Sequence, residues 1–107
     1  GVDGIYCPNE SSTYGMLLVL RDMGWAGKVK FVGFDASPKL LDGLSKGEID
    51  GLIVQNPRKM GYEGVKAIVA TIKKQPVERR IDTGATLVTK ANMGEPAMRE
   101  LLAPPKE

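Results

Sequence analysis

The feature that most restricts the fold of this chain is a regular alternation of short apolar segments with helical patterns. The strand candidates cover residues 3–7, 29–34 and 50–54, and the helix candidates that follow them cover 11–23, 38–46 and 57–74. In the third helix candidate, apolar residues recur at the i, i+3, i+4, i+7 spacing of one helical face, at Val65, Ile68, Val69 and Ile72. Parallel strands need helical crossovers, so three consecutive βα units predict an α/β fold, a three-layer parallel sheet covered on both faces.

The remainder of the chain adds two smaller elements. The segment "IDTGATLVTK" (81–90) alternates in part and is rich in threonine, which predicts a fourth, more exposed strand over 82–89. A short helix is expected over 96–102, and the tail "APPKE" is expected to be frayed. A length of 107 residues allows one core. We therefore expect residues 1–107 to form a single α/β unit.

Composition excludes several classes of function. The formal charge of +2 comes from acids and bases scattered along the chain, so we expect no nucleic-acid binding. The single cysteine, Cys7, and the absence of histidine remove the usual nucleophile and base pairs and the usual zinc ligands. We expect no catalytic activity, no metal and no other cofactor. The longest apolar run, "MLLVL" (16–20), is far shorter than the roughly 18 residues of a membrane span.

Polar residues follow each of the three predicted strands. The strand ends read "CPNESS", "GFDASP" and "VQNPRK", which places Asn9, Asp35 and Gln55 at or just after the carboxyl ends. In open α/β sheets ligands bind outside these ends, so the three side chains are expected to converge on one edge. A small polar ligand could bind there.

Helix capping is the competing interpretation, because Asn and Asp are good N-caps. Other residues are available for that role. Ser37 precedes Pro38 and Asn56 precedes Pro57, each a cap residue followed by proline at the favoured first position. Ser11 or Ser12 is expected to relieve Asn9 in the same way. Local structure therefore leaves the three strand-end residues unexplained, and a binding site remains open beside the structural interpretation.

Longer stretches of the sequence resemble a known family. The segments "YCPNESSTYGMLLVL", "VKFVGFDASPKLLDGLSKGEIDGLIVQNPRKMGYEGV" and "RIDTGATLVTKANM" are similar to the carboxyl-terminal part of bacterial periplasmic sugar-binding proteins of the ribose- and galactose-binding type. The similarity covers about residues 1 to 93, with the strand-end patterns at matching spacing. It implies a type I periplasmic binding protein-like fold and a non-catalytic solute-binding component of an ABC importer, located in the periplasm or otherwise outside the cytoplasm.

The resemblance also implies roles for residues. Asn9, Asp35 and Gln55 match the positions whose side chains bind sugar hydroxyls in the family, with Gln55 near the hinge between two lobes. The implied ligand is a monosaccharide, a pentose or a hexose. A membrane permease is the implied partner, and it reads the closure of the two lobes.

We expect this chain to be a fragment of such a two-lobe protein. The sequence opens with "GVDGIYC", without an initiator methionine or a signal-peptide pattern. In the family the helix over 57–74 belongs to the other lobe, so a monomer of this piece should not close a cleft. We therefore do not expect the isolated chain to bind sugar measurably. We expect it to pack as a rearranged small α/β unit, or to form a homo-oligomer in which another copy covers exposed sheet edges and apolar helix faces.

Two other classes stay open. In a flavodoxin-like or receiver-like signalling domain, Asp35 would be a phosphoacceptor or a cofactor contact. Such a domain normally has an acidic pair at the first strand end, where this chain offers only Glu10. The effector-binding lobe of a sugar-responsive transcriptional repressor is the other alternative.

Overall fold

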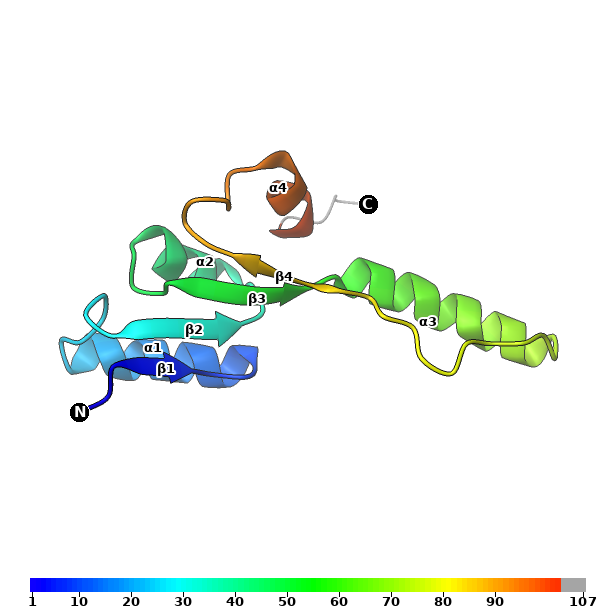
Figure 1. Cartoon of the computed structure of the whole chain (residues 1–107), viewed down its shortest axis with the longest axis horizontal. Coiled ribbons are helices and arrows are strands. Elements are labelled where there is room, and N and C mark those ends of the chain that lie inside the picture. The colour runs from blue at the N-terminus through cyan, green and yellow to red at the C-terminus, as the bar shows by residue number, and fades with distance from the viewer. Residues whose placement is uncertain (103–107) are drawn as a thin grey trace. The chain divides into compact units, whose positions relative to one another are not determined.

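The computed structural model describes residues 1–102, so the tail that was expected to be frayed lies outside the described residues. Strands and helices alternate along the described part of the chain (Figure 1). In order they are β1 (Gly4–Tyr6), α1 (Glu10–Asp22), β2 (Lys30–Phe34), α2 (Pro38–Ser45), β3 (Gly51–Gln55), α3 (Pro57–Ile72), β4 (Ala85–Val88) and α4 (Pro96–Leu102). Every expected element is present. The three consecutive βα units and the α/β class are confirmed.

The fourth strand begins three residues later than expected. The side chain of Asp82 accepts a hydrogen bond from the backbone N–H of Gly84 at 2.8 Å, and Gly84 has a φ of 81°. A residue with positive φ cannot continue a strand, and a side chain bonded to the backbone two residues on forms a turn. The strand therefore starts at Ala85.

The sheet has the strand order β1-β2-β3-β4. β1 pairs with β2 and β2 with β3 in parallel, with Tyr6 beside Val32 and Phe34 beside Ile53. Figure 1 shows β4 running against β3, so the sheet is mixed, with a parallel part formed by the three βα units. Parallel pairing of the first three strands is thus confirmed.

The chain clusters into two compact units. The first contains Gly1–Val54 and the residues from Thr86 onward, and the second is Gln55–Ala85. The first unit holds most of the sheet with α1, α2 and α4, and the second holds α3 and the segment that returns to β4. That the whole chain acts as a single unit stays a prediction.

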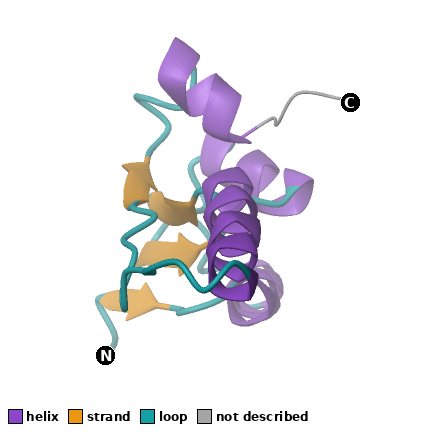
Figure 2. Cartoon of the chain, turned by 90° about the vertical axis from the view of Figure 1, so that its right-hand side faces the viewer, coloured by secondary structure: helices purple, strands orange, loops and turns teal. Residues whose placement is uncertain are grey.

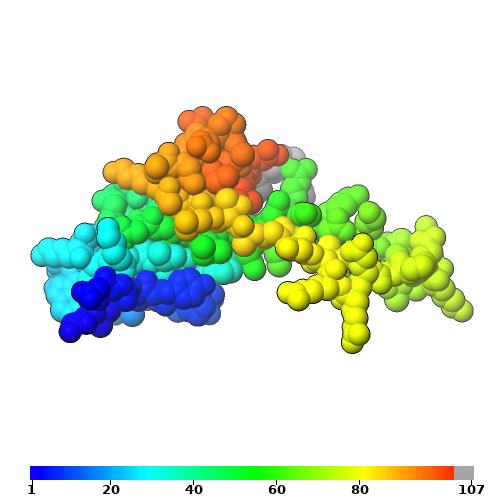
Figure 3. Space-filling model, in the orientation of Figure 1, coloured from blue at the N-terminus to red at the C-terminus, as the bar shows by residue number. Residues whose placement is uncertain are grey.

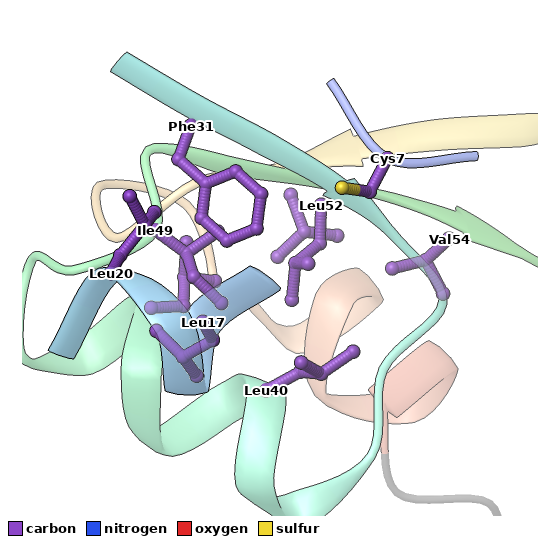
Figure 4. Close-up of a cluster of buried hydrophobic side chains, with 10 residues drawn as sticks. Cys7, Leu17, Leu20, Phe31, Leu40, Ile49, Leu52 and Val54 are labelled. Carbon is purple, nitrogen blue, oxygen red and sulfur yellow. The ribbon is translucent and has the colours of Figure 1, made fainter. Parts of the chain in front are cut away.

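In the first unit the core lies between the sheet and its helices (Figure 4). The fully buried side chains include Leu17 of α1, Phe31 of β2, Leu40 of α2 and Leu52 of β3. Figure 2 shows the strands edge-on, with the helices of this unit on one side of them. The expected cover on both faces is therefore incomplete in this unit. Right-handed crossovers between strands in sequential order place α1 and α2 on the same face, which is the physical reason.

An ion pair fastens α1 to the turn between α2 and β3. The Nε and Nη2 atoms of Arg21 donate to the two carboxylate oxygens of Glu48 at 2.9 and 2.8 Å. This two-point contact holds the pKa of Glu48 below its ordinary value, mainly through the hydrogen bond from Arg21. The contact lies at the end of the unit where α1 finishes.

The second unit consists of α3 and the segment that follows it. Asn56 caps α3, with its Oδ1 accepting from the N–H of Lys59 at 3.0 Å. Residues 76–82 and one side of α3 line a shared hollow, whose helical lining includes Lys59, Glu63 and Ala67. Figure 3 shows the returning segment (yellow) within this unit. No residue of α3 is buried.

Candidate functional site

Asn9 and Asp35 are delivered to the same edge of the sheet. Tyr6 of β1 and Val32 of β2 are register partners in adjacent parallel strands. Asn9 follows Tyr6 by three residues, and Asp35 follows Val32 by three. Because parallel strands end on the same side, both residues lie at the carboxyl edge, as the sequence predicted.

Asn9 is the N-cap of α1, so the expectation that Ser11 or Ser12 would take that role is wrong. The Oδ1 atom of Asn9 accepts from the backbone N–H of Ser12 at 2.9 Å and from the hydroxyl of Ser11 at 3.1 Å. The two serines are already inside the helix, where their own N–H groups are among those that need an acceptor. Asn9 still has its Nδ2 amide group, which donates hydrogen bonds only. The exposed position of Asn9 leaves this group accessible.

Asp35 has an unusual backbone conformation. Its φ is 69°, in the left-handed region that few residues other than glycine adopt. Its backbone N–H donates to the carbonyl of Ile53 at 2.8 Å, which fixes the residue against β3. The half-buried carboxylate makes no hydrogen bond within residues 1–102. Strained residues of this kind cluster at functional sites, so the conformation supports the site that the sequence predicted.

A buried threonine holds this strand end in place. The hydroxyl of Thr13 donates to the carbonyl of Asn9 at 2.7 Å and accepts from the N–H of Phe34 at 3.0 Å. Thr13 is fully buried against Gly33, where a side chain would overlap the methyl group of the threonine. The Thr13 side chain therefore links the backbone of Asn9 to that of Phe34, the residue before Asp35. Sequence reasoning missed Thr13, and its only signal was a glycine inside the second strand.

Gln55 is the last residue of β3 and the first residue of the second unit. It is half-buried, and the next residue, Asn56, provides the cap of α3. Ser37 likewise caps α2, through the N–H of Leu40 at 3.4 Å. Both of these expected caps are confirmed, and neither Asp35 nor Gln55 is needed for capping. That Gln55 joins Asn9 and Asp35 in one site stays a prediction.

A lysine and a tyrosine meet near the same edge. The ammonium group of Lys39, in the first turn of α2, lies 4.6 Å from the centre of the Tyr14 ring, in α1. The face of an aromatic ring attracts a cation, so this contact holds both side chains in place. No local pattern in the sequence signalled this contact of Lys39 with Tyr14.

The chemistry of Asn9 and Asp35 suits neutral ligands that are rich in hydroxyl groups. An ionised carboxylate accepts two hydrogen bonds, and an amide nitrogen donates two, so a hydroxyl group can satisfy either.

Within residues 1–102 no cluster of His, Cys, Asp and Glu side chains is arranged to hold a metal ion. None of the helices in this described part is long and apolar enough to cross a membrane.

A comparison with known protein families shows which family the chain belongs to. The model of the periplasmic binding protein domain matches residues 1–76. The chain belongs to the periplasmic binding protein family. The recognised resemblance to bacterial periplasmic sugar-binding proteins is thereby confirmed.

Individual relatives of this periplasmic binding protein are much longer than the chain itself. It is 30% identical over 76 residues to the D-allose-binding periplasmic protein of Escherichia coli, covering 71% of this chain and 24% of that protein. A solved carbohydrate transporter solute-binding protein of Agrobacterium radiobacter, in complex with D-arabinose, matches with a TM-score of 0.86 and 41% identity, over 92% of this chain and 34% of the other. A Brachyspira murdochii structure, described as an ABC transporter, LacI family transcriptional regulator, matches with a TM-score of 0.83 and 32% identity, over 94% and 35%. This chain thus spans about a quarter to a third of their length.

Proposed function

We propose that the chain is part of the sugar-binding, non-catalytic component of an ABC importer, with Asp35 as its central ligand contact. The observation that carries the proposal is the carboxylate of Asp35, held in a strained conformation at a strand end and free of hydrogen bonds within the described residues. Relatives named for D-allose binding or solved with D-arabinose support a monosaccharide as the ligand.

Each proposed ligand residue has its own chemical task. Asp35 accepts from two sugar hydroxyls in charge-assisted bonds. Asn9 donates from Nδ2, because its Oδ1 is occupied as the helix cap. Gln55 supplies a second amide, which both donates and accepts. Each sugar hydroxyl left unpaired on burial costs about 1 to 3 kcal/mol, which would give the site its selectivity among pentoses and hexoses.

The whole importer component would work by closure. Two lobes close on the sugar in the periplasm, and a membrane permease recognises the closed form. Since this chain spans only part of its relatives, binding of sugar by the chain alone should need concentrations far above those that the complete protein would need. A homo-oligomer of the chain belongs to the same set of proposals.

Nuclear magnetic resonance titration tests the ligand site directly. We expect D-allose or D-arabinose, added at high millimolar concentration, to shift the backbone amide signals around Asp35 and Asn9. The Asp35→Asn variant should abolish the shifts, because a neutral amide loses the charge-assisted bonds. Asp3→Asn is the matched control, since Asp3 precedes β1 at the opposite edge of the sheet. Equal binding by the two variants, or shifts only at the opposite edge, would contradict the proposal.

The repressor lobe is a second candidate because one relative carries a LacI-family name. A repressor lobe would use the same ligand site as the importer component. The two differ in their partner, because a complete repressor would bind DNA and a complete importer component would bind a permease. A gel-shift assay with the complete protein and DNA upstream of its gene distinguishes the two. Sugar-dependent DNA binding would favour the repressor, and its absence together with sugar uptake would favour the importer.

The signalling alternative makes a different chemical prediction. Incubation with acetyl phosphate and Mg²⁺ would attach a phosphoryl group to Asp35 of a receiver-like domain. We expect an unchanged mass for the wild-type protein, because the proposed carboxylate binds hydroxyls. A gain of one phosphoryl group that Asp35→Asn abolishes would favour the signalling class instead.

A further inference from the structure

The hydroxyl group of Thr13 takes the place of a strand neighbour at the end of β2. On the β1 side of β2, the last strand bond runs from the N–H of Cys7 to the carbonyl of Val32, at 3.0 Å. β1 ends at Tyr6, and the chain then leaves the sheet for α1, which begins at the same end (Figure 1). The next N–H of β2 on that side belongs to Phe34, and it donates to the Thr13 hydroxyl at 3.0 Å. A side chain of α1 therefore satisfies the donor that β1 no longer reaches.

The end of β2 is also held from its other side. The N–H of Asp35 donates to the carbonyl of Ile53 in β3, at 2.8 Å. The two peptide groups that flank Phe34 are thus both bonded, one to α1 and one to β3. Peptide groups are planar, so a residue between two fixed peptide groups has little freedom left in φ and ψ. Phe34 is therefore held in its strand conformation.

The connection from β2 to α2 is short. Phe34 ends the strand and Ser37 is already the N-cap of α2, so only Asp35 and Ala36 lie between them. Asp35 has a φ of 69°, and no other residue of this connection has a positive φ. The change of direction between the strand and the helix is thus concentrated at Asp35, the residue whose carboxylate we assign to the ligand.

We propose that Thr13 is a positioning residue of the ligand site, whose hydroxyl fixes Phe34 so that the turn falls on Asp35 and sets the place of its carboxylate. This role rests on the proposed sugar site and deepens it, because Thr13 acts through Asp35 and touches no ligand. The carbonyl of Asn9 accepts from the same hydroxyl at 2.7 Å. One buried group therefore sets the backbone at Asn9 and, through Phe34, at Asp35.

Helix chemistry alone does not explain the surroundings of Thr13. A threonine in a helix often bonds to the carbonyl four residues back, which accounts for its bond to Asn9. The hydroxyl has one proton, and because that proton goes to Asn9, the oxygen is left to accept from Phe34 in another element. Gly33 makes room for the side chain, since a Cβ atom there would lie 2.8 Å from Oγ1 of Thr13 and closer still to its methyl group. The fully buried Thr13 thus fits a gap in β2 that a glycine provides.

Two substitutions separate the hydroxyl of Thr13 from its methyl group. Thr13→Val keeps the shape of the side chain and removes both hydrogen bonds, whereas Thr13→Ser keeps the hydroxyl. Leu20→Ala is the matched control for a general loss of stability, because Leu20 is buried further along the same helix. All variants are compared at a temperature at which circular dichroism shows them folded.

The conformation of Asp35 is a readout that a general loss of stability does not move. A φ near 69° brings the amide and α protons of a residue close together, which gives a strong nuclear Overhauser effect between them. We expect this signal in the wild type, in Thr13→Ser and in Leu20→Ala, and its loss in Thr13→Val. Retention of the signal in Thr13→Val, or an equal loss in Leu20→Ala, would overturn the proposal.

Amide hydrogen exchange in the wild-type chain gives an independent check that needs no variant. The amide of Phe34 should be protected as well as the amide of Asp35, because the Thr13 hydroxyl holds the first as β3 holds the second. Rapid exchange at Phe34 beside a protected Asp35 would show that the hydroxyl does not hold the strand end, and the positioning role would be lost.

Titration with D-arabinose relates the conformation to binding. Far below saturation, the size of the amide shifts near Asp35 is proportional to the affinity for the sugar. These shifts should fall at least about threefold in Thr13→Val, because a ligand contact must be held within about 0.5 Å of its productive position. They should stay near the wild-type size in Thr13→Ser and Leu20→Ala, and undiminished shifts in Thr13→Val would contradict the positioning role. A wild-type chain without sugar-dependent shifts would count against the proposed function instead, and the conformation of Asp35 would still decide the role of Thr13.

Discussion

The two units of this chain differ in how much of their apolar surface is covered. In the first unit the side chains of Leu17, Phe31, Leu40 and Leu52 are fully buried. In the second unit α3 has a longer apolar pattern, yet Ile72 is 75% exposed and no residue of the helix is buried. The same kind of sequence pattern is thus satisfied in one unit and left without a partner in the other.

This difference separates helix formation from helix packing. Both α1 and α3 have a capping asparagine, and α2 and α3 also begin with proline at the first position. Local signals therefore specify where each helix begins. The stability of a helix comes mainly from packing its apolar side, which α3 does not achieve within its own unit. We expect amide hydrogen exchange to be slow in the first unit and fast in α3 of the monomer.

Truncation of apolar side chains should give the largest contrast between the units. Leu17→Ala removes buried methyl groups from the core and should lower the free energy of unfolding by about 2 to 5 kcal/mol. Ile72→Ala removes an exposed side chain and should change it by less than about 0.5 kcal/mol under monomeric conditions. Urea unfolding followed by circular dichroism measures both. Similar losses for the two variants would mean that α3 is packed in solution.

Thr13 should have the next largest effect, because it connects α1 with the end of β2. Thr13→Val keeps the shape of the side chain but removes both hydrogen bonds, leaving the N–H of Phe34 without its acceptor. We expect a loss of about 1 to 3 kcal/mol in the free energy of unfolding. Thr71→Val is the matched control in the second unit, where the hydroxyl donates to the carbonyl of Ala67 on an exposed surface. The control should be nearly neutral, and equal effects would show that Thr13 has no special role.

The order of the elements in this fold could be predicted from the sequence. Apolar runs, glycines and proline-capped helices are local signals, and they located every strand and helix to within a few residues. The direction of β4 and the single covered face could not be predicted in this way. Both depend on the order of the strands and on the handedness of the crossover connections, which no local sequence pattern specifies.

The common edge of Asn9 and Asp35 was predictable from the sequence, their local geometry was less so, and ligand binding by Asn9, Asp35 and Gln55 stays a prediction. Strand-end position identified Asn9 and Asp35, and the structure places both at one edge. The role of Asn9 as the N-cap of α1 was missed. Asparagine and serine are about equally good caps, so the sequence alone could not rank them. The left-handed conformation of Asp35 was also missed, since no local pattern in the sequence signals it.

Replacement of Asp35 by glycine should separate stability from function in the first unit. Glycine adopts a φ of 69° without strain, so Asp35→Gly should stabilise the fold by up to about 1 kcal/mol. The same variant removes the carboxylate and should therefore lose sugar binding.

Gly64→Ala is a useful comparison in the second unit. The added methyl group would meet no other atom within 4 Å, so this variant should stabilise α3 by about 0.5 to 1 kcal/mol without changing the candidate site. Thermal unfolding measures the stabilities, and destabilisation by Asp35→Gly would argue against backbone strain at this position.

The smallest expected effect is a dependence of stability on pH that is confined to the first unit. The hydrogen bond from Arg21 lowers the pKa of Glu48 below its ordinary value of 4.5. A carboxyl group with a lowered pKa in the folded state stabilises the protein above its unfolded pKa, and this contribution is lost as the pH falls through the folded value. The pair is partly exposed, so the loss should be at most about 1 kcal/mol. Glu48→Gln should therefore be less stable than the wild type at neutral pH, and the gap should close as the pH falls through the lowered pKa of Glu48. Hydrogen exchange at α3 should not follow this change, because the shifted group lies in the first unit, and a parallel response in both units would show that they unfold together.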